Sequence, residues 1–298
     1  MKQSNLSSLQ IINKFNNFKN QCKEFYDYII NYKKDTNDDM IIKPIFWFFQ
    51  FESGSEYFIP GDCNEYIEYF SNELNKDPNN GFAFYRRGYG KMKLKDYKGA
   101  LEDYHHAFEN YPNKESIYID RTLLFYCMGN QLKAFEDLNM AIKINQKNPV
   151  PYFNRGNIKI NNKDFKGAID DFTLITKMDK IPWWIYQVYN NKAISNYYLG
   201  NSIEAIQDLT MALKNASVNQ SKLIYRNRAY IKAMLGDYTG VIKDFDLMDE
   251  KDWDIILFQK GIAKYKLGKI KGACKDWSKA GELGYNQAYE YIKKYCQK

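Results

Sequence analysis

Small and large apolar residues alternate along most of the chain at intervals typical of helices. From residue 81 onward, large side chains recur every four or seven residues within short runs, and turn sequences such as LKD, NNKD and LGD separate these runs. Intervals of four and seven place side chains on one face of an α-helix. Each pair of runs therefore predicts two short helices joined by a tight turn, which is a helical hairpin.

The hairpin pattern is repeated six times. Successive copies are separated by 34, 34, 37, 36 and 32 residues. The second helix of each copy carries a small residue, at Ala100, Ala134, Ala168, Ala205, Val241 (the exception) and Ala273. The first helix carries another, twelve positions earlier, at Gly88, Thr122, Gly156, Ala193, Ala229 and Gly261. Small side chains at the contact let two helices approach to roughly 8–10 Å. The pattern predicts an all-α array of six hairpins over residues 81–284.

The repeated pattern resembles the tetratricopeptide repeat (TPR), in the multi-repeat form known from bacteria. The resemblance rests on the large and small pairs, the second-helix run and the closing proline, at Phe84 with Gly88, Tyr152 with Gly156, Ala100, Tyr104, Ala107 and Pro112. The family implies an α-solenoid whose first helices line a concave groove. It also implies a non-enzymatic scaffold or adaptor, which binds an extended or helical peptide segment of another protein in that groove.

Both ends of the array have their own expected structure. Residues 1–46 contain amphipathic helical spacing and predict an N-terminal helical cap, since the end of a solenoid exposes an apolar face. Residues 47–80 predict a degenerate seventh repeat, with an irregular helical subdomain as the alternative. Residues 285–298 predict a C-terminal capping helix.

A cation is followed sixteen residues later by an aspartate in every copy. The cations are Arg87, Arg121, Arg155, Lys192, Arg228 and Lys260, and the aspartates are Asp103, Asp137, Asp171, Asp208, Asp244 and Asp276. A phosphate-binding strip is one interpretation. Because each cation comes with its own carboxylate, we favour structural ion pairs, formed within a hairpin or across to a neighbour.

First-helix residues that do not pack between helices are candidates for the groove. One set is an amide ladder, Asn154, Asn191, Asn227 and Gln259, whose side chains could bond a peptide backbone. The alternative is that Asn is simply common at this position in the family. A second set consists of aromatic residues and one arginine, typical binding anchors, at Tyr85, Tyr89, Phe153, Tyr197, Arg226, Tyr230 and Phe258. Trp183 and Trp184 lie in an insertion, and they form a contact point if exposed or lengthen the next helix if buried.

The net charge of +7 is concentrated near the C-terminus. Residues 254–298 hold ten Lys or Arg and four Asp or Glu. A basic patch is expected there, formed by Lys264, Lys266, Lys269, Lys271, Lys275 and Lys279. It supports an alternative function, binding of single-stranded nucleic acid or of an acidic partner. A further alternative is self-association through the terminal helices.

Candidate catalytic chemistry is sparse. The chain has two His, His105 and His106, and no nucleophile, phosphate-loop or zinc-protease motif, so we expect no enzyme, no metal and no cofactor. Five widely spaced Cys predict reduced thiols and a cytoplasmic protein. The longest apolar run, residues 41–49, is too short for a membrane span.

Overall fold

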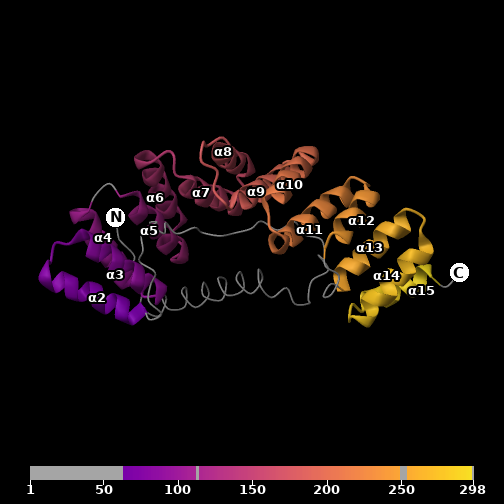
Figure 1. Ribbon diagram of the computed structural model, residues 1–298, viewed down its shortest axis with the longest axis horizontal. Coiled ribbons are helices and arrows are strands. Elements are labelled where there is room, and N and C mark those ends of the chain that lie inside the picture. Colours follow the sequence, from indigo (N-terminus) through magenta and orange to yellow (C-terminus); the bar gives the residue numbers. More distant parts are fainter. Residues whose placement is uncertain (1–62, 112–113, 249–253, 297–298) are drawn as a thin grey trace, which may run out of the picture. The chain divides into compact units, whose positions relative to one another are not determined.

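The computed structural model describes residues 63–111, 114–248 and 254–296. These residues form fourteen α-helices and no strand (Figure 1). The helices are α2 (Cys63–Lys76), α3 (Gly81–Lys93), α4 (Tyr97–Asn110), α5 (Glu115–Cys127), α6 (Gln131–Ile144), α7 (Pro149–Asn161), α8 (Phe165–Thr176), α9 (Ile185–Tyr198), α10 (Ser202–Asn215), α11 (Val218–Met234), α12 (Tyr238–Asp246), α13 (Asp254–Lys266), α14 (Ile270–Glu282) and α15 (Gln287–Tyr295). The predicted all-α solenoid of helical hairpins is confirmed.

The chain divides into two compact units within α7, between Ile158 and Lys159. In the described part of the first unit, α2 packs on α3, α3 on α4, and α5 on α6. In the second unit, α8 packs on α9, and each helix from α9 to α14 packs on the next, with α15 last. Neighbours in sequence are therefore neighbours in space, as expected for stacked hairpins.

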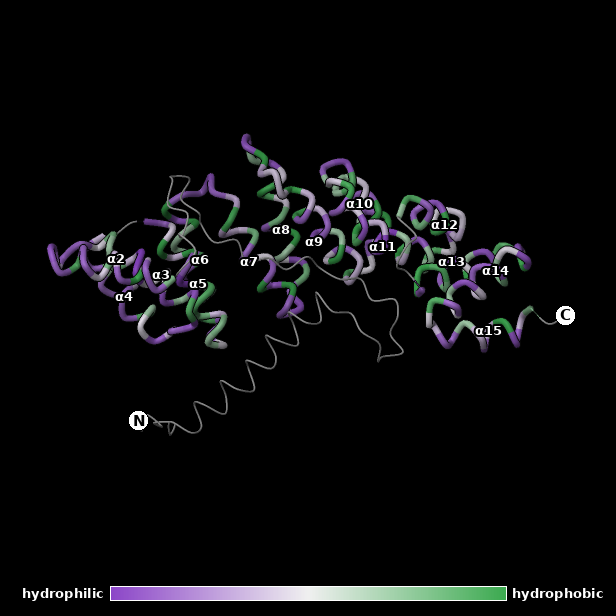
Figure 2. Tube along the Cα trace, turned by 60° about the horizontal axis from the view of Figure 1, so that its bottom comes forward, coloured by the Kyte–Doolittle hydropathy of each residue, from purple (hydrophilic) through white to green (hydrophobic). Residues whose placement is uncertain are grey.

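The small residues lie where helices of one hairpin approach each other. Ala100 and Ala273 are fully buried, as are the large residues Tyr104 and Trp277 four positions further along. A side chain at Gly261 would overlap the Trp277 indole ring, so the first helix can pass the second this closely only without one. Hydrophobic and hydrophilic residues are mixed along the helices, as the sequence pattern requires (Figure 2).

The turns inside the hairpins share one conformation. Gly129, Gly200 and Gly236 all have a positive φ just before the second helix, a region that glycine adopts without strain. At the equivalent place Lys95 and Lys163 have φ values of 65° and 61°. The residue that follows caps the next helix: Asp96 and its counterparts Asn130, Asp164 and Asp237 each accept a hydrogen bond from a backbone N–H three residues on.

The predictions for the two ends of the array differ in how much of each the structure describes. The predicted cap over residues 1–46, and residues 47–62 of the degenerate repeat, lie outside the described residues, and both stay predictions. Helix α2 covers the end of that repeat and buries Tyr66, Phe70 and Leu74. At the other end, Tyr291 and Tyr295 of α15 contact the Trp277 ring, with centroids 5.3 and 5.9 Å apart.

The expectation of reduced thiols is wrong for two cysteines. Cys274 of α14 and Cys296, which follows α15, form a disulfide with Cα atoms 5.9 Å apart. Spacing along the chain did not reveal the bond, because it depends on α15 folding back over α14. Cys63 and Cys127 are free thiols. The prediction of a cytoplasmic protein therefore loses one of its supports, since disulfides persist mainly in oxidising compartments.

Candidate functional site

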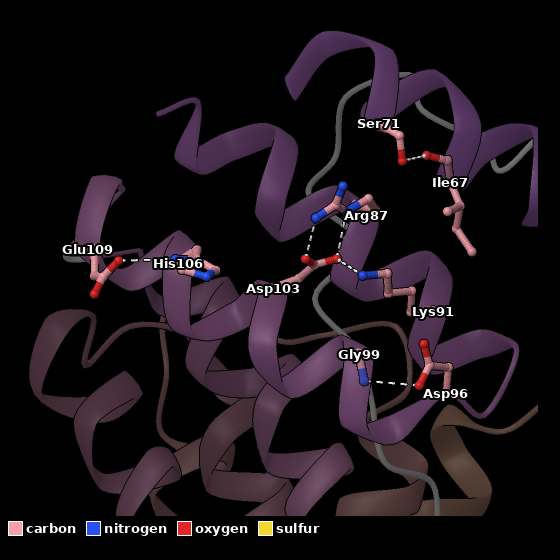
Figure 3. Close-up of polar contacts among 9 residues, drawn as sticks. All are labelled: Ile67, Ser71, Arg87, Lys91, Asp96, Gly99, Asp103, His106 and Glu109. Atoms are coloured by element: carbon pink, nitrogen blue, oxygen red, sulfur yellow. Dashed lines mark hydrogen bonds and ion pairs between the residues drawn. The ribbon is translucent and has the colours of Figure 1, made fainter. Parts of the chain in front are cut away.

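Ion pairs hold the two helices of a hairpin together at the predicted spacing. Arg87 donates from Nε and Nη2 to both oxygens of Asp103, at 2.9 and 2.7 Å (Figure 3). The same spacing joins Arg121 to Asp137, Lys192 to Asp208 and Arg228 to Asp244. In each pair the carboxylate side chain is at most 10% exposed. These four pairs support the structural interpretation of the cations that they contain.

A second row of cations, missed in the sequence, shares the same carboxylates. Lys91 lies 2.8 Å from Asp103 (Figure 3), and the equivalent pairs are Lys159–Asp171 at 2.8 Å, Lys232–Asp244 at 2.9 Å and Lys264–Asp276 at 2.6 Å. Each of these lysines follows the first-row cation by four residues, and that spacing was the available signal. The four lysines contribute positive charge beyond what the sixteen-residue pairs balance.

Pairing also reaches beyond a single hairpin. Lys260 of α13 pairs with Asp246 of α12, which belongs to the preceding hairpin. Arg155 donates from Nη1 to Asn139 of α6 at 2.6 Å. The sequence left open whether the cations act within hairpins or between them, and the structure contains both arrangements.

Two of the aspartates lack the second-row lysine. The position that holds Lys91 in the first hairpin holds Phe125 beside Asp137, and Asn196 beside Asp208. The Asn196 amide donates to Asp208 at 2.9 Å. Burial raises the pKa of both carboxyls above the ordinary aspartate value, although Arg121 and Lys192 oppose that shift.

The predicted amide ladder lies in the interior. Asn154, Asn191, Asn227 and Gln259 are all buried. In the second unit, Asn227 donates to the side chain of Asn190 at 2.9 Å, and Asn190 donates to Asn191 at 3.1 Å. Asn190 is a member of this network that sequence reasoning missed, since it lies one residue before the expected position. The network links α9 to α11 and fixes the spacing of two first helices.

The predicted aromatic anchors divide into buried and accessible side chains. Tyr85, Phe153 and Phe258 are buried. The Tyr85 hydroxyl donates to Asp120 at 2.9 Å, and burial raises the pKa of Tyr85 well above its ordinary value. Tyr89 is half-buried, with the Arg86 guanidinium 5.8 Å from its ring centre.

In the second unit, half-buried aromatic side chains lie together on α9 and α11. The rings of Tyr197 and Tyr230 are 5.7 Å apart and meet edge to face, with the two hydroxyls at 3.4 Å. Arg226 is also half-buried on α11. Tyr198 is 48% exposed and stacks on Phe165 of α8 at 4.8 Å. These residues give the first helices of this unit an accessible surface with aromatic and cationic character.

A small apolar pocket opens beside Tyr230. Its cavity volume is about 40 Å³, and it lies among α11, α12 and α13. Its lining consists of Ala229, Tyr230, Ala233, Tyr238, Val241, Phe245, Gln259, Ile262 and Ala263. No sequence motif indicated this pocket.

The insertion before α9 places its two tryptophans differently. Trp183 is 76% exposed, whereas Trp184 is 5% exposed. Trp184 stands at the N-terminal boundary of α9 and is buried, so of the two outcomes that the sequence left open, burial holds for Trp184 and exposure for Trp183. Trp183 remains a candidate contact.

The C-terminal basic patch is smaller than expected. Lys264 is half-buried and holds Asp276, so it belongs to the structural pairs and not to the patch. The remaining members, Lys266, Lys269, Lys271, Lys275 and Lys279, are exposed. Lys271, Lys275 and Lys279 follow each other at intervals of four along α14 and therefore share one face.

The two histidines, which are the acid–base candidates of the sequence, lie on the surface. His105 and His106 are exposed on α4 and approach Glu109 at 3.7 and 3.2 Å (His106 is drawn in Figure 3). Within residues 63–111, 114–248 and 254–296, no three His, Cys, Asp or Glu side chains gather as metal ligands would. Every helix in these ranges is too short or too polar to cross a lipid bilayer.

Comparisons with known proteins agree with the repeat pattern. No family model matches the chain. Human tetratricopeptide repeat protein 6 is 27% identical over 131 residues, which are 44% of this chain and 24% of that protein, so the match spans about a quarter of the curated relative.

Solved structures show the same fold at low identity. The C-terminal part of a TPR repeat-containing protein from Cytophaga hutchinsonii is 17% identical, with a TM-score of 0.66 over 76% of this chain and 93% of that one. YrrB, described as a TPR protein with an unusual peptide-binding site, is 15% identical with a TM-score of 0.55 over 64% of this chain and 97% of that one. The sixfold repeat, the hairpins it forms and these likenesses together show the fold of a tetratricopeptide repeat solenoid.

Proposed function

We propose that the chain is a non-catalytic scaffold that binds a peptide segment of another protein on the first-helix face of its second unit. The observation that carries this proposal is the accessible group on α9 and α11, formed by Tyr197, Tyr198, Arg226 and Tyr230. Tyrosine and arginine are enriched among the residues that dominate binding energy. YrrB, a structural neighbour, has a peptide-binding site, which makes this use of the fold a reasonable expectation.

The buried amides have a different role in this proposal from the one expected. Asn190, Asn191 and Asn227 bond to one another, so they hold α9 and α11 at a fixed distance and do not themselves meet a ligand. The binding surface is then rigid before the segment arrives. Preformed surfaces lose less conformational freedom on binding, which favours affinity.

The test compares capture of partner proteins by wild type and by two variants. The groove variant is Tyr198→Ser/Arg226→Ser/Met234→Ser, in which Tyr198 and Met234 occupy the same position of successive first helices. The matched control is Ile203→Ser/Leu247→Ser, which removes apolar side chains that are 66% and 63% exposed near the second helices. Circular dichroism must show that all three are equally helical.

A partner captured by wild type and by the control, but lost with the groove variant, supports the proposal. Cross-links from that partner should then fall on α9, α11 or α13. Equal capture by all three proteins would contradict it, as would a partner whose cross-links fall on the second helices alone.

A second candidate function rests on the lysine row of α14. Lys271, Lys275 and Lys279 are exposed on one helix face, which suits phosphates of single-stranded nucleic acid or an acidic protein. Replacing all three by glutamine should weaken RNA binding and reduce its salt dependence if this function exists. Self-association and a cytoplasmic location stay predictions, which concentration-dependent mass and cell fractionation would test.

A further inference from the structure

One position of the first helix carries a large side chain in five of the six hairpins and a small one in hairpin α11–α12. It lies four residues after the small residue, and its occupants are Met92, Tyr126, Ile160, Tyr197, Ala233 and Tyr265. Five of these side chains are large, whereas Ala233 ends at Cβ. Ala233 lines the pocket described above, so the pocket exists where the array lacks its usual large side chain.

The hairpin α3–α4 shows how the position is normally filled. Met92 is 5% exposed, and the hydroxyl of Tyr104 lies 3.9 Å from its sulfur. In hairpin α11–α12 the two equivalent residues are Ala233 and Phe245, so both the thioether and the hydroxyl are missing. The space that they would occupy stays open at half-buried Ala233.

The pocket matches an aliphatic side chain in size and polarity. A cavity of about 40 Å³ holds roughly three water-sized groups, since each needs about 10–15 Å³. That is the size of the branched end of leucine, isoleucine or valine. Apart from Gln259 and the Tyr hydroxyls, the lining is apolar, and Tyr230 and Ile262 border it from α11 and α13.

The first helices that border the pocket carry two basic side chains at positions shared by successive repeats. Arg226 is half-buried on α11, three residues before the small residue Ala229, and Lys266 is exposed on α13, five residues after the small residue Gly261. At the same positions the two helices carry no acidic residue. A segment that binds across them therefore gains from negative charge near its apolar anchor.

We propose that the pocket receives one branched aliphatic side chain from an acidic segment of another protein. The inference rests on the proposed function, because it specifies the chemistry of the segment bound on the same first-helix face. The aliphatic side chain supplies the large group that Ala233 lacks. Arg226 and Lys266 favour Asp or Glu beside it.

The test uses a displayed library of random twelve-residue peptides, selected on the full chain. Selected peptides should share Leu, Ile or Val next to Asp or Glu. They should bind Ala233→Met about 10- to 100-fold more weakly than wild type, because the new side chain occupies the pocket and the peptide loses burial of its anchor. Thr239→Met adds the same side chain at an exposed position of α12 and should bind like wild type.

Thermal melting separates blocked binding from damaged folding. A methionine that fills the pocket should leave the melting temperature unchanged or raise it, because cavity filling commonly stabilises. Ala233→Val is the second variant if methionine proves too large for the site. Replacing the anchor of a selected peptide by Ala should weaken binding to wild type and have little effect on binding to Ala233→Met.

Each contrary outcome has a distinct meaning. Peptides that bind Ala233→Met as tightly as wild type but lose affinity for the groove variant overturn this inference and leave the proposed function intact. Selected peptides that bind both variants like wild type, or an absence of selected peptides, count against both. If the synthetic peptide of residues 36–46, which contains the chain's own DDMII, is alone able to bind the pocket, the assignment to another protein is overturned.

Discussion

Hairpins α3–α4 and α11–α12 share the same ion pairs and helix cap, which together are called the frame below. Each centres on a buried aspartate that holds an arginine and a lysine. The pairs are Asp103 with Arg87 and Lys91 in the first hairpin, and Asp244 with Arg228 and Lys232 in the second. Their second helices begin with the same aspartate cap, Asp96 or Asp237. These contacts fix how the two helices of a hairpin cross, and they are the same in both hairpins.

The difference between the two hairpins lies beside the frame. Met92 and Tyr104 fill the space between the helices of the first hairpin, whereas Ala233 and Phe245 leave a pocket in the second. The frame therefore tolerates the loss of one large side chain without losing its ion pairs. The residues that define the fold recur along the chain. A residue next to the frame can differ in one hairpin and acquire a function there.

The largest expected effect comes from making the first hairpin resemble the second. Met92→Ala should lower the free energy of unfolding by about 3 kcal/mol, because it opens a cavity at a residue that is 5% exposed. Urea unfolding followed by circular dichroism measures the change. Met92→Leu keeps the volume and should cost less than about 1.5 kcal/mol. A cost below 1 kcal/mol for Met92→Ala would show that the two hairpins do not depend on this position differently.

The shared frame should be almost as sensitive. Asp103→Asn and Asp244→Asn should each cost about 2 kcal/mol, because each leaves two partly buried cations without a carboxylate. Exposed Asp170→Asn is the control and should be within about 0.5 kcal/mol of wild type. Clearly unequal losses at Asp103 and Asp244 would contradict the view that the frames are equivalent.

The sequence predicted well the features that recur from repeat to repeat, and it predicted poorly the features that occur at a single place. The hairpins and four of the ion pairs follow from spacing along one or two helices, which sequence records directly. The Asn190 network, the disulfide between Cys274 and Cys296 and the pocket beside Ala233 depend on how separate helices pack. Such contacts join residues whose distance in sequence carries no fixed period.

Burial of the amides illustrates the same limit at the candidate site. The sequence places these amides on the first helices, but whether a side chain there meets solvent or a neighbouring helix is decided by the adjacent repeats. Asn227 meets Asn190 of the preceding first helix, 37 residues away. A single helix pattern cannot distinguish these outcomes.

A smaller effect is expected at the helix caps that the two hairpins share. Asp96→Ala and Asp237→Ala each remove an acceptor for the backbone N–H of a glycine three residues on, at 2.9 and 2.8 Å. Each should cost about 1 kcal/mol. Only one of these hairpins has a pocket. Equal losses would therefore show that the caps contribute the same stability whether or not the neighbouring space is filled. Asp96→Ser and Asp237→Ser should restore most of the stability, since serine also caps helices.

The smallest effect concerns pH and uses hairpin α5–α6, where Phe125 stands in place of the second-row lysine. Burial raises the pKa of Asp137 above 3.8, so the folded state retains this proton at pH values where the unfolded chain has released it. The contribution of Asp137 to stability is therefore fully present below its unfolded pKa and falls as pH rises through the folded pKa. Asn does not titrate, so the stability cost of Asp137→Asn should be larger at pH 3.5 than at pH 6.5.

Asp208 provides an independent second case, because Asn196 stands where a lysine would and burial raises its pKa as well. Urea unfolding of Asp137→Asn and Asp208→Asn at the two pH values should show the same sign. A cost that grows with pH would mean that the carboxylate stays charged without a second-row lysine as firmly as it does with one. The second lysine row would then add charge to the surface without adding to the frame, and the equivalence drawn between Asp103 and Asp244 would rest on their arginines.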